Sequence, residues 1–144
     1  MPDVRGCHLP EDRLYDVANH TWLKEMDDGN IKLGMTAVAT AMAGPLVAFT
    51  PKKAGRSVEP GKTCATVESG KWVGPAKSAV GGEVAAVNTV LVETPSIANS
   101  DPYEAGWMVI LKPKDWAAVK PTLTPGADVA PKYEAKMAAD GFAG

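Results

Sequence analysis

The sequence of 144 residues has little of several features that usually mark a function. It contains two cysteines and two histidines, no Cys-x-x-Cys pair, and no His or acidic residues at metal-ligand spacing. Neither a structural zinc site nor a disulfide framework is therefore expected. The formal net charge is -2, and no large cluster of Lys and Arg is available to hold a phosphate backbone. This charge pattern argues against nucleic acid as a partner.

Long apolar runs are missing as well. No stretch approaches the roughly 20 residues of a membrane span, and the first residues, MPDVRGCHLPEDR, lack the apolar segment of a signal peptide. We therefore expect a cytoplasmic protein with no membrane partner. The motifs GxGxxG, GxxxxGK[ST], HExxH and GxSxG are also absent from the sequence, so we expect no catalytic residue and no metal site.

Glycine and proline are plentiful instead, with 14 and 12 residues. They divide the chain into short segments, a spacing that predicts many short strands in a mainly β barrel or sandwich. Residues 19–35 read as a hairpin around Gly29. Residues 36–43 read as a short helix that Thr36 caps and Gly44 ends. Residues 89–103 are expected to form a loop with at most one helical turn. With helical segments in the C-terminal tail, two or three short peripheral helices are expected.

The two cysteines are expected to differ. Cys64 lies in an alternating run that places Cys64, Thr66 and Glu68 on one face of a strand, and we expect a small buried side chain. Cys7 stands beside His8 in an N-terminal arm that is expected to be loose, where its thiol would be either inert or reactive.

The stretch VESGKW places Lys71 after a strand-like run and a glycine. Taken alone, Lys71 is an ordinary solvated lysine. If two strands fold back on each other here, however, the tip between them presents one exposed lysine. Gly70 and Gly74-Pro75 would then give the tip its sharp geometry.

Five segments together resemble a known family. In order and spacing, they are similar to the glycine-cleavage H protein over residues 19–118: HTWLKEMDDGNIKLGMT, GPLVAF, VEPGKTCATVESGK, GGEVAAVN and ANSDPYEAGWMVILK. The resemblance implies a lipoyl-type hammerhead barrel-sandwich hybrid over residues 19–118. Residues 1–18 would be the N-terminal arm, and residues 119–144 a tail whose short helix packs on the domain.

The resemblance also implies a cofactor and a role. Lys71 would carry lipoic acid in amide linkage. Glu68, three residues before it, and Gly82, eleven after it, would be read by the lipoate-attaching enzyme. Lys77 lacks such a glutamate. The five-membered dithiolane cannot reach the relaxed disulfide dihedral, so it is easily opened. The protein would then be a carrier that serves partner enzymes, not an enzyme itself.

The chain departs from the family pattern near this lysine. Thr21 follows His20 where the family usually has Glu, so a neutral hydroxyl replaces a carboxylate that would shelter a cationic cargo. Both residues are expected in the surroundings of the arm. Trp72 directly follows Lys71 and would cover the arm, dock a partner or pack into the core.

A small basic cluster, Lys52, Lys53 and Arg56, replaces an acidic stretch of the family. It is either a solvated turn or a docking surface. These departures resemble the lipoate-binding proteins of sulfur oxidation that work beside a heterodisulfide-reductase-like complex. We therefore expect a cytoplasmic lipoyl carrier in sulfur-compound oxidation. One alternative is a glycine-cleavage H protein that carries the aminomethyl group between glycine-cleavage enzymes; another is a lipoate relay or scaffold.

Overall fold

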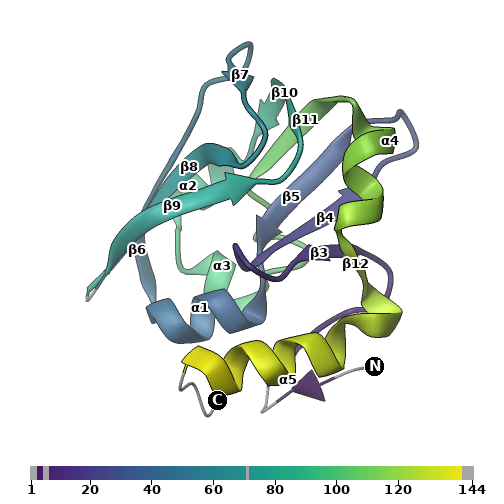
Figure 1. The fold of residues 1–144 in the computed structure, drawn as a ribbon. Coiled ribbons are helices and arrows are strands. Elements are labelled where there is room, and N and C mark those ends of the chain that lie inside the picture. Colours follow the sequence, from purple (N-terminus) through teal and green to yellow (C-terminus); the bar gives the residue numbers. More distant parts are fainter. Residues whose placement is uncertain (1–2, 5–6, 71, 141–144) are drawn as a thin grey trace.

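The computed structural model describes residues 3–4, 7–70 and 72–140, which form antiparallel sheets with short helices around them (Figure 1). The strands are β1 (Asp3–Val4), β2 (Cys7–His8), β3 (Leu14–Asp16), β4 (Thr21–Glu25), β5 (Ile31–Met35), β6 (Leu46–Pro51), β7 (Ser57–Val58), β8 (Lys62–Ser69), β9 (Val73–Ser78), β10 (Gly81–Val87), β11 (Val109–Lys114) and β12 (Thr124–Pro125). The α-helices are α1 (Ala37–Ala43), α2 (Thr89–Glu93), α3 (Ile97–Ser100), α4 (Trp116–Val119) and α5 (Val129–Asp140), with 3-10 turns at Lys120–Thr122 and Gly126–Asp128. The mainly β prediction is confirmed.

Two sheets enclose the main core. The larger has seven strands in the order β12-β3-β4-β5-β11-β10-β7, and the smaller has three in the order β6-β8-β9. Apolar residues of both sheets, including Leu33, Val67 and Leu111, belong to one buried cluster. The small sheet therefore packs against the large one. Its β8–β9 hairpin projects from the body of the molecule (Figure 1).

The local signals for the first hairpin and the first helix are confirmed. β4 and β5 pair around a turn in which Gly29 has φ 85°, a left-handed conformation that favours glycine. Thr36 caps α1 by accepting a hydrogen bond from the Ala39 N–H, and Gly44 ends the helix with φ 82°. These elements matter for function because α1, the end of β5 and the turn before β4 line the pocket described below.

A second core joins the two ends of the described chain. Cys7 and Leu9 pack with residues of α1 and α5, and α5 runs beneath α1 (Figure 1). The segment is therefore not loose over its described part: β3 is a strand of the large sheet, and Cys7 is only 5% exposed. Burial raises the pKa of the Cys7 thiol, so the structure gives no support to the reactive alternative.

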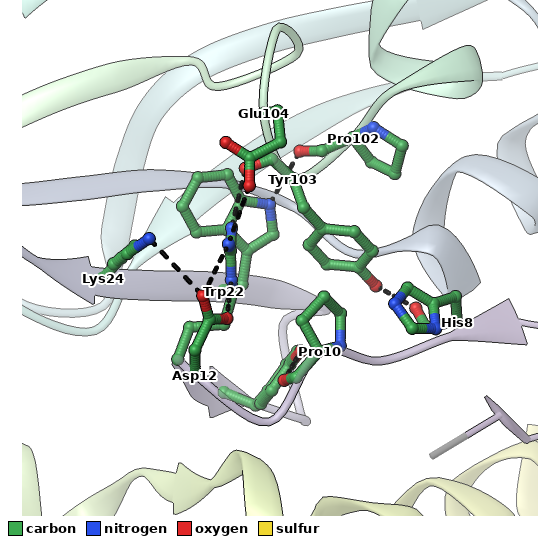
Figure 2. A network of polar contacts seen from close by, with 10 residues as sticks. His8, Pro10, Asp12, Trp22, Lys24, Pro102, Tyr103 and Glu104 are labelled. Carbon is green, nitrogen blue, oxygen red and sulfur yellow. Dashed lines mark hydrogen bonds and ion pairs between the residues drawn. The ribbon is translucent and has the colours of Figure 1, made fainter. Parts of the chain in front are cut away.

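Arg13 fastens this segment to the loop at residues 101–104. Its side chain is 1% exposed, and its Nη1 donates to the Tyr103 carbonyl at 2.7 Å. The guanidinium lies 4.7 Å from the Trp22 ring centroid and also forms ion pairs with Asp12 and Glu104. Figure 2 shows Trp22 and Tyr103 side by side, with Asp12 and Glu104 around them. The buried cation is thus fully partnered and has a structural role.

Two expectations differ from the structure. Residues 89–103 form two short helices, α2 and α3, because Leu91 and Ala98 are drawn into the core. The described residues therefore hold five α-helices rather than two or three. In β8, Cys64 does not share the exposed face of Thr66 and Glu68. An irregularity between Thr63 and Ala65 shifts the register, so Cys64 is buried on the side of the core.

Candidate functional site

The β8–β9 hairpin turns tightly between Ser69, the last residue of β8, and Val73, the first of β9. The Ser69 N–H donates to the Trp72 carbonyl at 2.7 Å, and Glu68 pairs with Val73. Lys71 itself lies outside the described residues, and its role stays a prediction. The expected contribution of Gly74-Pro75 to the tip is wrong, because both residues lie inside β9.

Glu68 and Lys77 lie at different distances from the tip. Glu68 is exposed on β8, one pair from the loop, where an attaching enzyme can reach its carboxylate. Lys77 is exposed on β9 and pairs with Thr63, four residues beyond Val73. At about 3.3 Å per residue, this places Lys77 about 13 Å further from the tip.

Gly82 lies at the opposite end of β9 from the tip, on β10. It pairs with Pro113 and Val58. A Cβ at this position would lie 2.9 Å from the carbonyl carbon of Lys112 and closer still to its oxygen. The absence of a side chain is thus required by the approach of β11. Gly82 therefore has a packing reason to be glycine. Its recognition by an attaching enzyme stays a prediction.

A pocket of about 460 Å³ opens beside the inner face of the hairpin. Three regions form its walls: the turn before β4 with the end of β5, one face of α1, and Trp72 with the middle of β9. The described lining residues are mostly apolar and include no carboxylate; they are Asn19, His20, Met35, Ala39, Met42, Ala43, Trp72, Pro75 and Ala76. Such a cavity suits an apolar group that enters from the tip and disfavours a buried cation.

His20 is the titratable residue of this lining, and α5 holds it in place. Its ring stacks on Tyr133 at a centroid distance of 5.7 Å, and its Nδ1 lies 3.3 Å from the Tyr133 hydroxyl. Its Nε2 lies 3.9 Å from Asp140, which also pairs with Lys136 at 3.4 Å. Burial lowers the pKa of His20, and the positive charge of Lys136 lowers it further. The imidazole is therefore neutral at neutral pH.

Thr21 is placed differently from His20 and Trp72. It is fully buried opposite Met35, and its hydroxyl has no hydrogen-bond partner within the described residues. Thr21 lies beside Met35 on the neighbouring strand and is not among the lining residues, whereas His20 and Trp72 both line the pocket. Of the three residues expected around the arm, the structure brings two together.

The basic cluster lies far from the hairpin tip. The Gly55 N–H donates to the Val84 carbonyl, and the Val84 N–H donates to the Arg56 carbonyl, so the segment is held against β10. The Lys52 N–H bonds to Cys64, five residues of β8 before Ser69, which is about 17 Å along the strand.

Sequence reasoning missed most of the lining. Ala39, Met42 and Ala43 stand at i, i+3 and i+4 of α1 and so share one helix face, a signal that the sequence does contain. Met35 and Ala76 gave no comparable signal, because only the packed fold brings β5 and β9 to the same cavity.

Other kinds of site are not found in the described part of the chain. There, no group of three His, Cys, Asp or Glu side chains could hold a metal ion. No described helix is long and apolar enough to cross a membrane. Cys64 is buried, and burial raises the pKa of its thiol to about 12, so it is not a nucleophile at neutral pH.

An antiparallel barrel-sandwich that carries a projecting hairpin beside a pocket has the architecture of a lipoyl carrier. The model of the glycine cleavage H-protein family matches residues 14–136. The glycine cleavage system H protein 5 of Aquifex aeolicus is 49% identical over 127 residues, 85% of each chain. The probable H protein 2 of Sulfurisphaera tokodaii is 39% identical over 131 residues, 90% of this chain and 88% of the relative. The chain belongs to the glycine cleavage H-protein family.

A solved structure agrees with this assignment. The crystal structure of a glycine cleavage system H protein from Mycobacterium marinum superposes with a TM-score of 0.73 at 30% identity, covering 92% of this chain and 99% of that one. Members of the family are lipoyl carriers rather than catalysts, they hold lipoate on a lysine, and they work with glycine-cleavage enzymes. The residues present fit such a group, because the apolar pocket opens directly beside the hairpin tip.

Proposed function

We propose that Lys71 carries the lipoyl group and that the chain serves sulfur-compound oxidation, with a heterodisulfide-reductase-like complex as its partner. When bound, the group supplies a strained disulfide that a thiolate or reductant opens easily. The hairpin presents the attachment residue to partner enzymes. The pocket provides an apolar resting place between two partners.

The observation that carries the proposal is that no carboxylate lines the pocket within the part of the chain that the structure describes. An aminomethyl cargo is cationic, and a sheltered cation requires an anion or several acceptors. Thr21 offers only a neutral hydroxyl, which is buried beside Met35 and is not part of the described lining. The Asp140 carboxylate lies 3.9 Å from His20, but it also forms an ion pair with Lys136 at 3.4 Å. A neutral dithiol cargo does not need such a counter-charge.

Support also comes from the relatives. Three of them, named H proteins 5, 3 and 2, occur in one organism, Aquifex aeolicus, at 49%, 40% and 40% identity. One glycine-cleavage system needs a single H protein, so several copies leave some available for other partners. The second candidate, a glycine-cleavage H protein, is favoured by the printed names of these same relatives.

The test compares two partners on the same preparation. Protein purified from its own host is first checked by peptide mass spectrometry for a lipoyl group on Lys71, supplied by a lipoate-attaching enzyme. The lipoylated protein is then offered to glycine decarboxylase and to a heterodisulfide-reductase-like complex with a reduced sulfur compound. We expect poor aminomethyl loading and support of sulfur oxidation. Efficient aminomethyl loading would favour the second candidate, and an unmodified Lys71 would defeat both.

A further inference from the structure

The indole of Trp72 packs on the backbone of Gly74, in the strand that follows it. This contact with Gly74 is called the seat of the indole below. Gly74 and Ala76 share one side of β9 because side chains alternate along a strand, and Trp72, directly before the strand, lies on that side too. A Cβ on Gly74 would lie 2.8 Å from Cε2 and from Cη2 of the indole. The ring thus rests directly on the Gly74 backbone, in space that any other residue at position 74 would fill.

Because of this contact with Gly74, the Trp72 side chain forms part of the pocket wall. The side chain lines the cavity together with Met42 and Pro75, yet the residue stays 41% exposed. It is therefore neither buried core nor a free projection at the tip. Its neighbour Val73 points to the opposite side of the strand and is 62% exposed. Among the lining residues, Trp72 is the one next to Lys71 in sequence.

We infer that Trp72, seated on Gly74, is a positioning residue that keeps the lipoyl group in the pocket and so limits its exposure to solvent. This inference rests on the proposed attachment to Lys71. An aromatic face gives sulfur a favourable contact, and the indole supplies a large apolar surface at the outer side of the cavity. The ring faces the methionine and alanine side chains of β5 and α1 across the cavity, so the group would lie between these side chains and the indole.

The experiment measures how accessible the arm is. Wild type, Trp72→Ala, Trp72→Phe, Gly74→Ala and Val73→Ala are lipoylated with a purified attaching enzyme, and full modification is checked by intact mass. The arm is reduced, and its alkylation by iodoacetamide is followed at peptide level, so that Cys7 and Cys64 are counted separately. Denatured samples give the rate for a fully open arm, and circular dichroism confirms the fold.

We expect Trp72→Ala to be alkylated roughly two- to tenfold faster than wild type, the ratio that corresponds to one lost sulfur–aromatic contact. Trp72→Phe should lie between the two. Gly74→Ala should also be faster, because it keeps the indole but removes its seat. Val73→Ala should match wild type, since it loses apolar area at the same tip without touching the pocket.

Equal rates in wild type, Trp72→Ala and Gly74→Ala would overturn the inference, and so would an equal increase in Val73→Ala. A second readout is tryptophan emission, which should change between the oxidised and reduced arm in wild type but not in Trp72→Phe. Failure of the proposed function would appear elsewhere, as an unmodified Lys71 in the host or as efficient aminomethyl loading.

Discussion

Replacing Arg13 with methionine should destabilise the protein strongly, although the site lies far from the hairpin tip. The substitution keeps an unbranched apolar stem and removes the guanidinium. The largest losses are the hydrogen bond to the Tyr103 carbonyl at 2.7 Å and the cation–π contact with Trp22 at 4.7 Å; the ion pairs with Asp12 and Glu104 are lost as well. The carbonyl would then stay buried without its donor.

The magnitude follows from these contacts. A hydrogen bond from a charged donor contributes about 1.5–3 kcal/mol, and a desolvated cation–π contact contributes about 1–2 kcal/mol. The carboxylates of Asp12 and Glu104 are more than half exposed and return to water at little cost. Allowing for the apolar packing that methionine retains, we expect a loss of about 3 kcal/mol in the free energy of unfolding. The midpoint should fall by about 10 °C.

Urea unfolding followed by circular dichroism measures this loss. The matched control is Lys24→Met, because Lys24 pairs with the same Asp12 carboxylate at 3.5 Å but is 40% exposed. It should change the stability by less than about 0.5 kcal/mol. If Arg13→Met stays within about 1 kcal/mol of wild type, the buried guanidinium does not hold the second core, and the reasoning fails.

Four further predictions concern the site and its frame. Lys71→Arg should abolish lipoylation and carrier function while the unfolding midpoint stays unchanged; lipoylation of the variant at another lysine would contradict this. Glu68→Ala should lower the rate of lipoylation at unchanged stability, measured by intact mass over time, and full modification at the wild-type rate would remove Glu68 from the site. Gly82→Ala should cost more than about 2 kcal/mol in urea unfolding, because the new Cβ meets the Lys112 carbonyl; a neutral variant would show that β11 can shift. His20 has a lower pKa when folded than unfolded, so stability is full above about pH 6.5 and falls as the pH drops below it; His20→Asn should flatten this slope between pH 7 and 5, and an equal slope in the variant would contradict the assignment.

How far the sequence predicts the structure depends on the range of the interactions involved. The turn at Gly29 and the Thr36 cap are local signals, and both elements form where they were expected. The register shift between Thr63 and Ala65 is set by pairing with β9, so the alternation of the sequence gave the wrong face for Cys64.

The functional site also combines features set by local sequence with features set by long-range packing. The hairpin and its exposed Glu68 follow from a short stretch of chain. The pocket does not, because its walls come from three separate regions that only the folded core brings together. The tight seat of Trp72 on Gly74 is close in sequence, yet it depends on which side of β9 faces the barrel.

The second core affects the order in which parts of the structure fold and locally unfold. Its key contacts join residues that are far apart in the chain: Arg13 and Tyr103 are separated by 90 residues, and His20 and Tyr133 by 113. Contacts of this range form late in folding, because long loops must close first. Amide protons of α5 and β2 should therefore exchange before those of β8 and β10. Since His20 takes its orientation from Tyr133, each brief detachment of α5 also frees one wall of the pocket while the barrel stays intact.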